Sequence, residues 1–159
     1  MEKSKSEIIS NVKNKIKIPE EKPLEKELFF FFGLPGVGKT TIAKKINEKY
    51  SKTTVYLSTD MISLSQNLDY SDKYHWTFEI FDYFIDEYLS KGYSVIADTN
   101  ADKYEIRKKY YKIAKKRNAI PYVFWVKADI EHLKERQEKR RQKEPQNLRK
   151  EYIYSHTVE

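Results

Sequence analysis

The sequence contains no cysteine, which excludes disulfide bonds and zinc sites built from thiolates. Its longest run of apolar residues, 28–32, is far too short to span a bilayer. The N-terminal stretch lacks the apolar block of a secretory signal peptide. At 159 residues the chain is about the size of one domain, and we expect a soluble, cytoplasmic protein without a membrane partner.

Glycine is also scarce. The chain has four glycines, and three of them, Gly33, Gly36 and Gly38, lie within six positions of one another. They directly follow the apolar run and precede a lysine-rich segment with helical spacing. Because glycine is used where the backbone must adopt unusual dihedral angles or approach a ligand closely, this stretch is the first candidate for a functional site.

Acidic residues are too few to balance the basic ones, so the net charge is +7. Residues 102–118 alone hold eight basic and two acidic residues, a net charge of +6. A basic face of this kind attracts polyanions. A lysine-rich helix face also serves solubility alone, so the composition leaves both interpretations open.

The chain divides by composition into two parts. Residues 1–27 are highly charged; "SEIISNVKNKI" is compatible with a short amphipathic helix, and Pro19 and Pro23 among charges indicate a linker. We expect the folded core to begin near Leu28. The predicted organisation is therefore a charged N-terminal extension, 1–27, followed by one domain, 28–159.

Hydrophobic patterning within the domain predicts alternating strands and helices. The expected strands are 28–32, 53–58, 93–98 and 121–128, and the expected helices are 39–50, 72–92, 103–118, 129–144 and one that starts at Pro145. For the helix at 103–118 the inward residues are predicted to be Tyr104, Ile106, Tyr110, Ile113 and Ala114. Such alternation is typical of an α/β three-layer sandwich with a parallel sheet, here of four to five strands, and helices on both faces.

The glycine-rich stretch fits the pattern G-x-x-x-x-G-K-[ST] of a P-loop, and it lies between a strand and a helix as that motif requires. The expected fold is therefore that of a P-loop NTPase. Backbone amides of the loop and the start of the helix should hold the phosphates of ATP. Lys39 should reach the β and γ phosphates, and the Thr40 hydroxyl should bind Mg²⁺. The predicted nucleotide-binding residues are Gly33, Leu34, Pro35, Gly36, Val37, Gly38, Lys39, Thr40 and Thr41.

Three further features favour a kinase over a hydrolase. Asp98 at the end of the third strand is followed by Thr99 and not by the glutamate with which many ATPases activate water. Asp60 at the end of the second strand is placed to act as a base for an acceptor hydroxyl, although it also suits a helix N-cap. Arg136 and Arg140 lie four residues apart, on one face of a helix suited to be a closing lid.

Five features of the sequence together resemble the P-loop kinases that include the kinase domain of phage polynucleotide kinase and the zeta-toxin kinases. They are "GLPGVGKTT", "STD", "GYSVIADTN", Arg107 and "HLKERQEKR". The resemblance implies transfer of the γ-phosphate of ATP to a hydroxyl group with Mg²⁺ as cofactor. It implies that Asp60 is a base that also binds the acceptor and that Asp98 supports Mg²⁺. It also implies that Thr99 and Asn100 contact the acceptor, and that Arg136 and Arg140 bind ATP and the phosphate being transferred.

The acceptor itself is not fixed by these motifs. In the polynucleotide kinase an arginine lies three residues after the catalytic acid, whereas this chain has Ser63 at that acceptor-binding position. A 5′-hydroxyl polynucleotide is the first candidate acceptor, and a nucleotide-like or other small molecule is the second. The alternatives from other classes are an ATP-binding switch or NTPase that regulates a partner protein, and a nucleic-acid-binding module with a vestigial P-loop.

Overall fold

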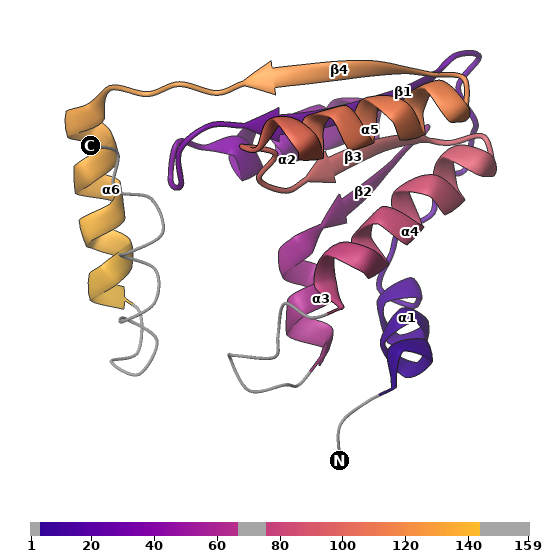
Figure 1. Ribbon diagram of the computed structural model, residues 1–159, viewed down its shortest axis with the longest axis horizontal. Helices are drawn as coiled ribbons and strands as arrows, with labels where there is room; N and C mark the ends of the chain where they lie inside the picture. Colours follow the sequence, from indigo (N-terminus) through magenta and orange to yellow (C-terminus); the bar gives the residue numbers. More distant parts are fainter. Residues whose placement is uncertain (1–3, 67–75, 144–159) are drawn as a thin grey trace.

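The computed structural model describes residues 4–66 and 76–143 and is shown in Figure 1. In chain order its elements are α1 (Lys5–Lys13), β1 (Lys26–Phe32), α2 (Lys39–Tyr50), β2 (Thr54–Ser58), α3 (Thr59–Gln66), α4 (Thr77–Ser90), β3 (Ser94–Asp98), α5 (Tyr104–Lys116), β4 (Ala119–Trp125) and α6 (Ile130–Lys143). None of the helices within these ranges is both long and apolar enough to cross a bilayer.

The four strands form one parallel sheet in the order β2-β3-β1-β4. Ser58 at the end of β2 is in register with Asp98 at the end of β3, and Phe32 at the end of β1 is in register with Trp125 at the end of β4. The carboxyl ends of the strands therefore meet at one edge of the sheet. This is the edge at which ligands bind in open α/β folds.

Both faces of the sheet are covered, because successive side chains of a strand point to opposite sides. Leu28 and Phe30 of β1 belong to a core cluster shared with α4 and α5, whereas Phe29 and Phe31 belong to a second cluster with α2. Figure 1 shows α4 and α5 on one side of the sheet. The predicted three-layer α/β fold is thus confirmed, with four strands in the described residues.

The core extends further toward the N-terminus than we expected. Ile8 and Val12 of α1 are fully buried and Ile16 is nearly so, all three within the cluster that contains β1, α4 and α5. Ile8 and Val12 lie four positions apart on one face of α1, which packs on α3 beside the lower end of α4 (Figure 1), and Ile16 follows just after the helix ends. The expectation that the core begins near Leu28 was wrong, because the surrounding charges hid this narrow apolar stripe.

Smaller differences concern element boundaries. Asn118 adopts a left-handed conformation (φ 52°) that ends α5 and lets β4 begin at Ala119, two residues before the predicted start. Tyr104 was predicted to face inward, but it is 64% exposed at the first turn of α5. The helix expected at 72–92 is described from Thr77, and the helix expected from Pro145 lies outside the described residues.

Candidate active site

The loop between β1 and α2 has a backbone that depends on glycine. Gly33, Gly36 and Gly38 have φ values of 142°, 84° and 106°, in the left-handed region that L-residues rarely adopt. A β-carbon at Gly33 would lie 2.3 Å from the carbonyl oxygen of Val126, whereas one at Gly38 would meet no atom within 4 Å. The loop is therefore packed closely at its start and open at its end, where α2 begins.

Lys39 is the first residue of α2, and its side chain folds back over this loop. Its Nζ donates hydrogen bonds to the carbonyl oxygens of Gly33, at 2.6 Å, and Leu34, at 3.1 Å. The ammonium group thus lies on the loop where a bound anion would also be reached by the N-terminal amides of α2. A helix N-terminus and a lysine ammonium both favour negative charge, so this arrangement suits a phosphate group.

A hydrogen-bonded group links α2 to the ends of β2 and β3. Thr40 Oγ1 donates to Asp98 Oδ1 at 3.2 Å, and the Tyr56 hydroxyl donates to Asp98 Oδ2 at 2.5 Å. Burial raises the pKa of the Asp98 carboxyl, while the hydrogen bonds from Tyr56 and Thr40 lower it, and the nearby charge of Asp60 raises it further. The net direction is a raised pKa, which shows that holding a charge here is unfavourable by itself.

The oxygen atoms of Thr40 and Asp98 fit the chemistry of Mg²⁺. This ion prefers oxygen ligands and in nucleotide sites is held by one or two protein oxygens together with phosphates and water. Within residues 4–66 and 76–143 there is no cluster of three or more His, Cys, Asp or Glu side chains that could hold a metal ion. When bound with a nucleotide, Mg²⁺ would neutralise the charge of the phosphates.

Asp60 lies in the first turn of α3, directly after β2, and is exposed. Burial is the main cause of the raised pKa values of Asp98 and Tyr56, and the charge of Asp60 raises both further. Ser63, one turn later, donates its hydroxyl to the Asp60 carbonyl at 3.1 Å. Asp60 is thus exposed to solvent and close enough to Asp98 for their charges to interact, while the Ser63 hydroxyl bonds to its own helix.

Thr99 and Asn100, predicted to contact the acceptor, lie in the loop that follows β3. Thr99 is only 5% exposed and lies beside the hydroxyl of Tyr110 on α5. Asn100 donates its side-chain amide to the carboxylate of Asp102. In this conformation both side chains contribute to the structure of the loop.

The same loop also holds the start of the P-loop. Asp102 Oδ1 accepts a hydrogen bond from the backbone amide of Gly33 at 3.2 Å. Arg107 on α5 donates to the carbonyl oxygens of Ala101, at 2.8 Å, and Asp102, at 2.5 Å. These bonds fix the two loops relative to each other at the carboxyl edge of the sheet.

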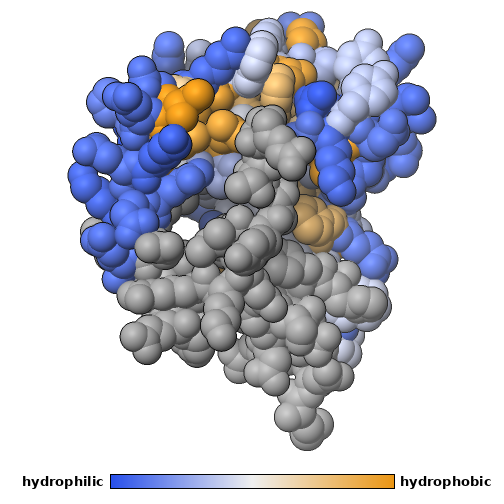
Figure 2. All heavy atoms as spheres, turned by 60° about the vertical axis from the view of Figure 1, so that its left-hand side comes forward, coloured by the Kyte–Doolittle hydropathy of each residue, from blue (hydrophilic) through white to orange (hydrophobic). Residues whose placement is uncertain are grey.

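Helix α6 reaches across to the glycine-rich loop. Leu133 is buried in the same hydrophobic cluster as Val37, and Gln137 Nε2 donates to the carbonyl oxygen of Pro35 at 3.0 Å. Arg136, next to Gln137, is exposed, and the side chain of Arg140 lies outside the described part of the structure. Figure 2 turns the side of the molecule that carries α6 forward. Hydrophilic residues lie along the left and right edges of this view, and hydrophobic residues lie between them in its upper part.

Residues 28–153 match the family model described as "AAA domain". The chain belongs to this AAA domain family. A search of the curated proteins finds no match to the sequence.

Several solved structures share this fold, and three of them illustrate the degree of similarity to the chain. The chain is similar to a structure of the PezAT toxin–antitoxin system of Streptococcus pneumoniae, with a TM-score of 0.75 and 14% identity over 89% of this chain and 64% of that one. It is similar to a chain of the Pnkp1/Rnl/Hen1 RNA repair complex, with a TM-score of 0.64 and 18% identity over 79% of this chain and 40% of that one. It is also similar to the Mycobacterium tuberculosis APS kinase CysC in complex with AMPPNP and APS. The TM-score is 0.53, with 16% identity over 74% of this chain and 71% of that one.

At these identities the likeness establishes the fold alone, and the chain spans less than two thirds of the first two structures. Together with the family match, it confirms the predicted resemblance to P-loop kinases at the level of family and fold.

Three residues of this AAA domain contribute to the site and were not predicted from the sequence. Tyr56 has the alternation of a strand residue, but its contact with Asp98 depends on the register of β2 and β3. Asp102 was counted only as a charge, and Gln137 only as part of a charged helix. The spacing of Leu133 and Gln137, four residues apart, was the one signal for the face of α6 that contacts the loop.

Proposed function

We propose that this protein is a kinase that transfers the γ-phosphate of ATP to a hydroxyl group, with Mg²⁺ as cofactor. The observation that carries the proposal is the position of Asp60. Asp60 lies in the first turn of α3, directly after β2, and its charge contributes to the raised pKa of Asp98, whose Oδ1 accepts a hydrogen bond from Thr40.

Each group then has a defined task. The loop amides and the Lys39 ammonium hold the phosphates, and Thr40 with Asp98 would hold Mg²⁺ beside them. Asp60 accepts the proton of the acceptor hydroxyl as its oxygen attacks the γ-phosphorus. The bond from phosphorus to the bridging oxygen breaks, ADP leaves, and the phosphate ester remains on the acceptor.

The lid completes the proposed site. Helix α6 contacts the P-loop through Leu133 and Gln137, so its neighbouring Arg136, and Arg140 one turn later, are carried by an element that lies on the loop. We assign both arginines to the negative charge of the transferring phosphoryl group.

For the acceptor, a polynucleotide 5′-hydroxyl is favoured over a nucleotide-like small molecule. The basic segment 102–118 supports a polyanionic acceptor. A chain of an RNA repair complex shares the fold, which also supports this choice. Ser63 at the position of the expected acceptor-binding arginine favours the small molecule instead.

The test is transfer of label from γ-labelled ATP to a panel of acceptors: 5′-hydroxyl DNA and RNA, nucleosides, nucleotide sugars and aminoglycosides. We expect a labelled product with at least one hydroxyl acceptor in the presence of Mg²⁺, and no transfer by Lys39→Ala. Release of labelled phosphate at the same rate with every acceptor and with none would refute the kinase and support the alternative, an NTPase or switch that regulates a partner.

A further inference from the structure

One stripe on the outer face of α5 alternates aromatic and basic residues. Tyr104, Lys108, Tyr111 and Lys115 follow one another at spacings of four, three and four residues, so their side chains lie along one side of the helix. The two tyrosines are 64% and 54% exposed, and both lysines are exposed. Exposed aromatic rings interleaved with cations on one face are unusual for a face that serves only solubility.

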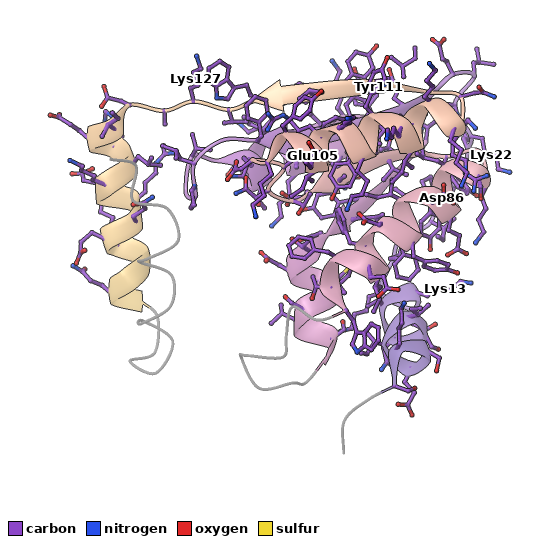
Figure 3. The ribbon with its side chains drawn as sticks, in the orientation of Figure 1. Lys13, Lys22, Asp86, Glu105, Tyr111 and Lys127 are labelled. Atoms are coloured by element: carbon purple, nitrogen blue, oxygen red, sulfur yellow. The ribbon has the colours of Figure 1, made fainter. Side chains whose placement is uncertain are left out.

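The edge strand β4 continues this pattern beside the helix. Trp125 at its end is 62% exposed and stacks on Phe32, with ring centres 5.6 Å apart and planes 13° from parallel. Lys127 follows, with its Nζ 3.3 Å from the centre of the tryptophan ring. Figure 3 shows Tyr111 projecting from α5 alongside β4 and Lys127 beyond the end of that strand, on the same upper side of the molecule.

The helix stripe and the strand end meet at Phe32. The Arg107 guanidinium, next to Lys108 in α5, lies 4.6 Å from the centre of the Phe32 ring, on which Trp125 also stacks. We call the set formed by Tyr104, Lys108, Tyr111, Lys115, Trp125 and Lys127 the α5–β4 surface. Since Phe32 immediately precedes Gly33, this surface borders the nucleotide-binding loop.

Basic residues at α5 and its C-terminal end that lie beside α4 are paired with its carboxylates. Lys109 pairs with Asp82, and both Lys116 and Arg117 pair with Asp86. Among the described residues no carboxylate pairs with Lys108, Lys115 or Lys127. Lys108 lies over the Tyr104 ring, 5.8 Å from its centre, as Lys127 lies over Trp125, so the charges of the three lysines are not neutralised and can pair with an external anion.

We infer that the α5–β4 surface binds a single strand of nucleic acid. The three exposed aromatic rings supply faces on which bases stack, and the lysines between them supply charge for the phosphates. A base that stacks on Trp125 displaces Lys127, which then pairs with a phosphate; the exposed cation–π contact it loses is weaker than base stacking. A duplex presents no free base faces, and an acidic peptide gains nothing from the rings, so both fit this surface less well.

This inference goes beyond the proposed kinase, because it concerns a binding surface outside the site that holds Lys39, Thr40 and Asp98. The surface would retain a strand beside the catalytic edge whether or not that strand is the acceptor.

The first experiment uses tryptophan fluorescence. The chain has two tryptophans, so Trp76→Phe leaves Trp125 as the only reporter, and Trp125→Phe leaves Trp76. An oligothymidylate of about 20 nucleotides, long enough for several stacked bases, should quench the first variant and leave the second nearly unchanged. Equal quenching of both variants, or quenching of neither, would overturn the inference.

The second experiment separates charge from stacking by fluorescence anisotropy of the labelled oligonucleotide. Lys108→Ala and Lys115→Ala should each lower the slope of log affinity against log salt by about 0.7, the value for one phosphate of a single strand. Tyr104→Ala and Tyr111→Ala should weaken binding roughly 5-fold or more. The matched controls, Lys45→Ala and Tyr50→Ala, lie on α2 across the sheet and should behave as wild type.

Two outcomes would reject the nucleic-acid assignment. Unchanged affinity in all four surface variants would place binding elsewhere, and competition by polyglutamate as strong as by unlabelled oligonucleotide would show a general polyanion surface. Binding of a fluorescent ATP analogue, measured on the same proteins, keeps the two proposals distinct. If wild type failed to bind the ATP analogue, the kinase would be refuted and the α5–β4 surface would stand, whereas the oligonucleotide results test that surface and, with it, the preference for a polynucleotide acceptor.

Discussion

At the scale of single residues, the site concentrates carboxylates that differ in environment. Asp98 is buried and hydrogen-bonded, with a raised pKa caused chiefly by burial, whereas Asp60 is exposed at the start of α3. A buried, positioned carboxylate suits a magnesium site, and an exposed one suits contact with a substrate that enters from solvent. The two acids can therefore be separated by mutation.

Asp60→Asn should spare nucleotide binding and lower phosphate transfer by roughly 10²-fold or more, the usual scale for the loss of a general base. The amide keeps the size of the side chain but cannot accept the acceptor's proton. Steady-state transfer from γ-labelled ATP and binding of a fluorescent ATP analogue are the two measurements. Near-normal turnover on the true acceptor would show that Asp60 is not the base.

Tyr56→Phe should lower the affinity for Mg²⁺, so that about 10-fold more Mg²⁺ is needed to saturate the site. This is the lower end of the effect of losing a residue that hydrogen-bonds to a metal ligand. The Tyr56 hydroxyl orients Asp98 through Oδ2, and its loss leaves Thr40 as the side chain that donates to this carboxylate. The readout is Mn²⁺ binding in the presence of nucleotide, followed by electron paramagnetic resonance.

Tyr93→Phe is the matched control, because this tyrosine packs against Tyr88 away from the site. It should bind Mn²⁺ as wild type does. If Tyr56→Phe and Tyr93→Phe have the same metal affinity, then the hydrogen bond to Asp98 has no positioning role. Nucleotide binding without metal should be equal in both variants.

At the scale of elements, helix α1 is a structural part of the domain. It packs on α3, which carries Asp60, and Lys15 donates to the Ser65 hydroxyl at 3.0 Å across this contact. Ile8→Ala should lower the free energy of unfolding by about 2–5 kcal/mol, the range for truncating a fully buried isoleucine. Ile18→Ala, at a 47% exposed position, should change it by less than about 0.5 kcal/mol.

Urea unfolding of the two isoleucine variants decides between two interpretations of the N-terminal segment. If Ile8→Ala were as stable as Ile18→Ala, the segment would be the dispensable extension that its composition suggests.

A second pair of elements, α4 and α5, is joined by a bidentate ion pair. Arg117 donates through Nε to Asp86 Oδ1 at 2.8 Å and through a terminal nitrogen to Oδ2 at 2.5 Å. These hydrogen bonds lower the pKa of Asp86 below its ordinary value of 3.8. The folded state therefore binds this proton less tightly than the unfolded state, so the pair stabilises the fold above that pH and its contribution is lost as the pH falls through the lowered pKa.

Asp86→Asn should therefore melt at a lower temperature than wild type at neutral pH, and the difference should shrink progressively once the pH is below about 3.8. Glu105→Gln, on the exposed first turn of α5, is the control and should follow wild type throughout. A difference in melting temperature that is constant from neutral to acid pH would mean that the ion pair does not act through this titration.

Most elements could be predicted because their signals are local. The P-loop pattern, the apolar run of β1 and the helix at Lys39–Tyr50 depend on neighbouring residues, and each lies within a few positions of its predicted place. The contacts of Tyr56, Asp102 and Gln137 depend on which strand lies beside which and on how α6 crosses the loop. Spacing along the chain contains no information on those long-range distances, so these residues emerged only from the structure.

At the scale of the whole molecule, the glycine-rich loop connects the two cores that lie on opposite faces of the sheet. Val37 belongs to the cluster that includes α2 and α6, while the amide of Gly33 is held by Asp102 in the loop that leads to α5. A ligand bound to this loop therefore contacts a segment whose neighbours come from both layers. Its binding free energy should appear as global stability and not as local ordering alone.

Saturating wild type with Mg²⁺ and a non-hydrolysable ATP analogue at 100 times the dissociation constant should raise the free energy of unfolding by about 2.7 kcal/mol. Lys39→Ala should lose most of this gain, because the cation that folds over the loop carbonyls of Gly33 and Leu34 is gone. Lys45→Ala, on the exposed side of the same helix, should keep it. Urea unfolding with and without ligand measures all three proteins, and equal stabilisation of Lys39→Ala and wild type would mean that the nucleotide binds elsewhere than on this loop.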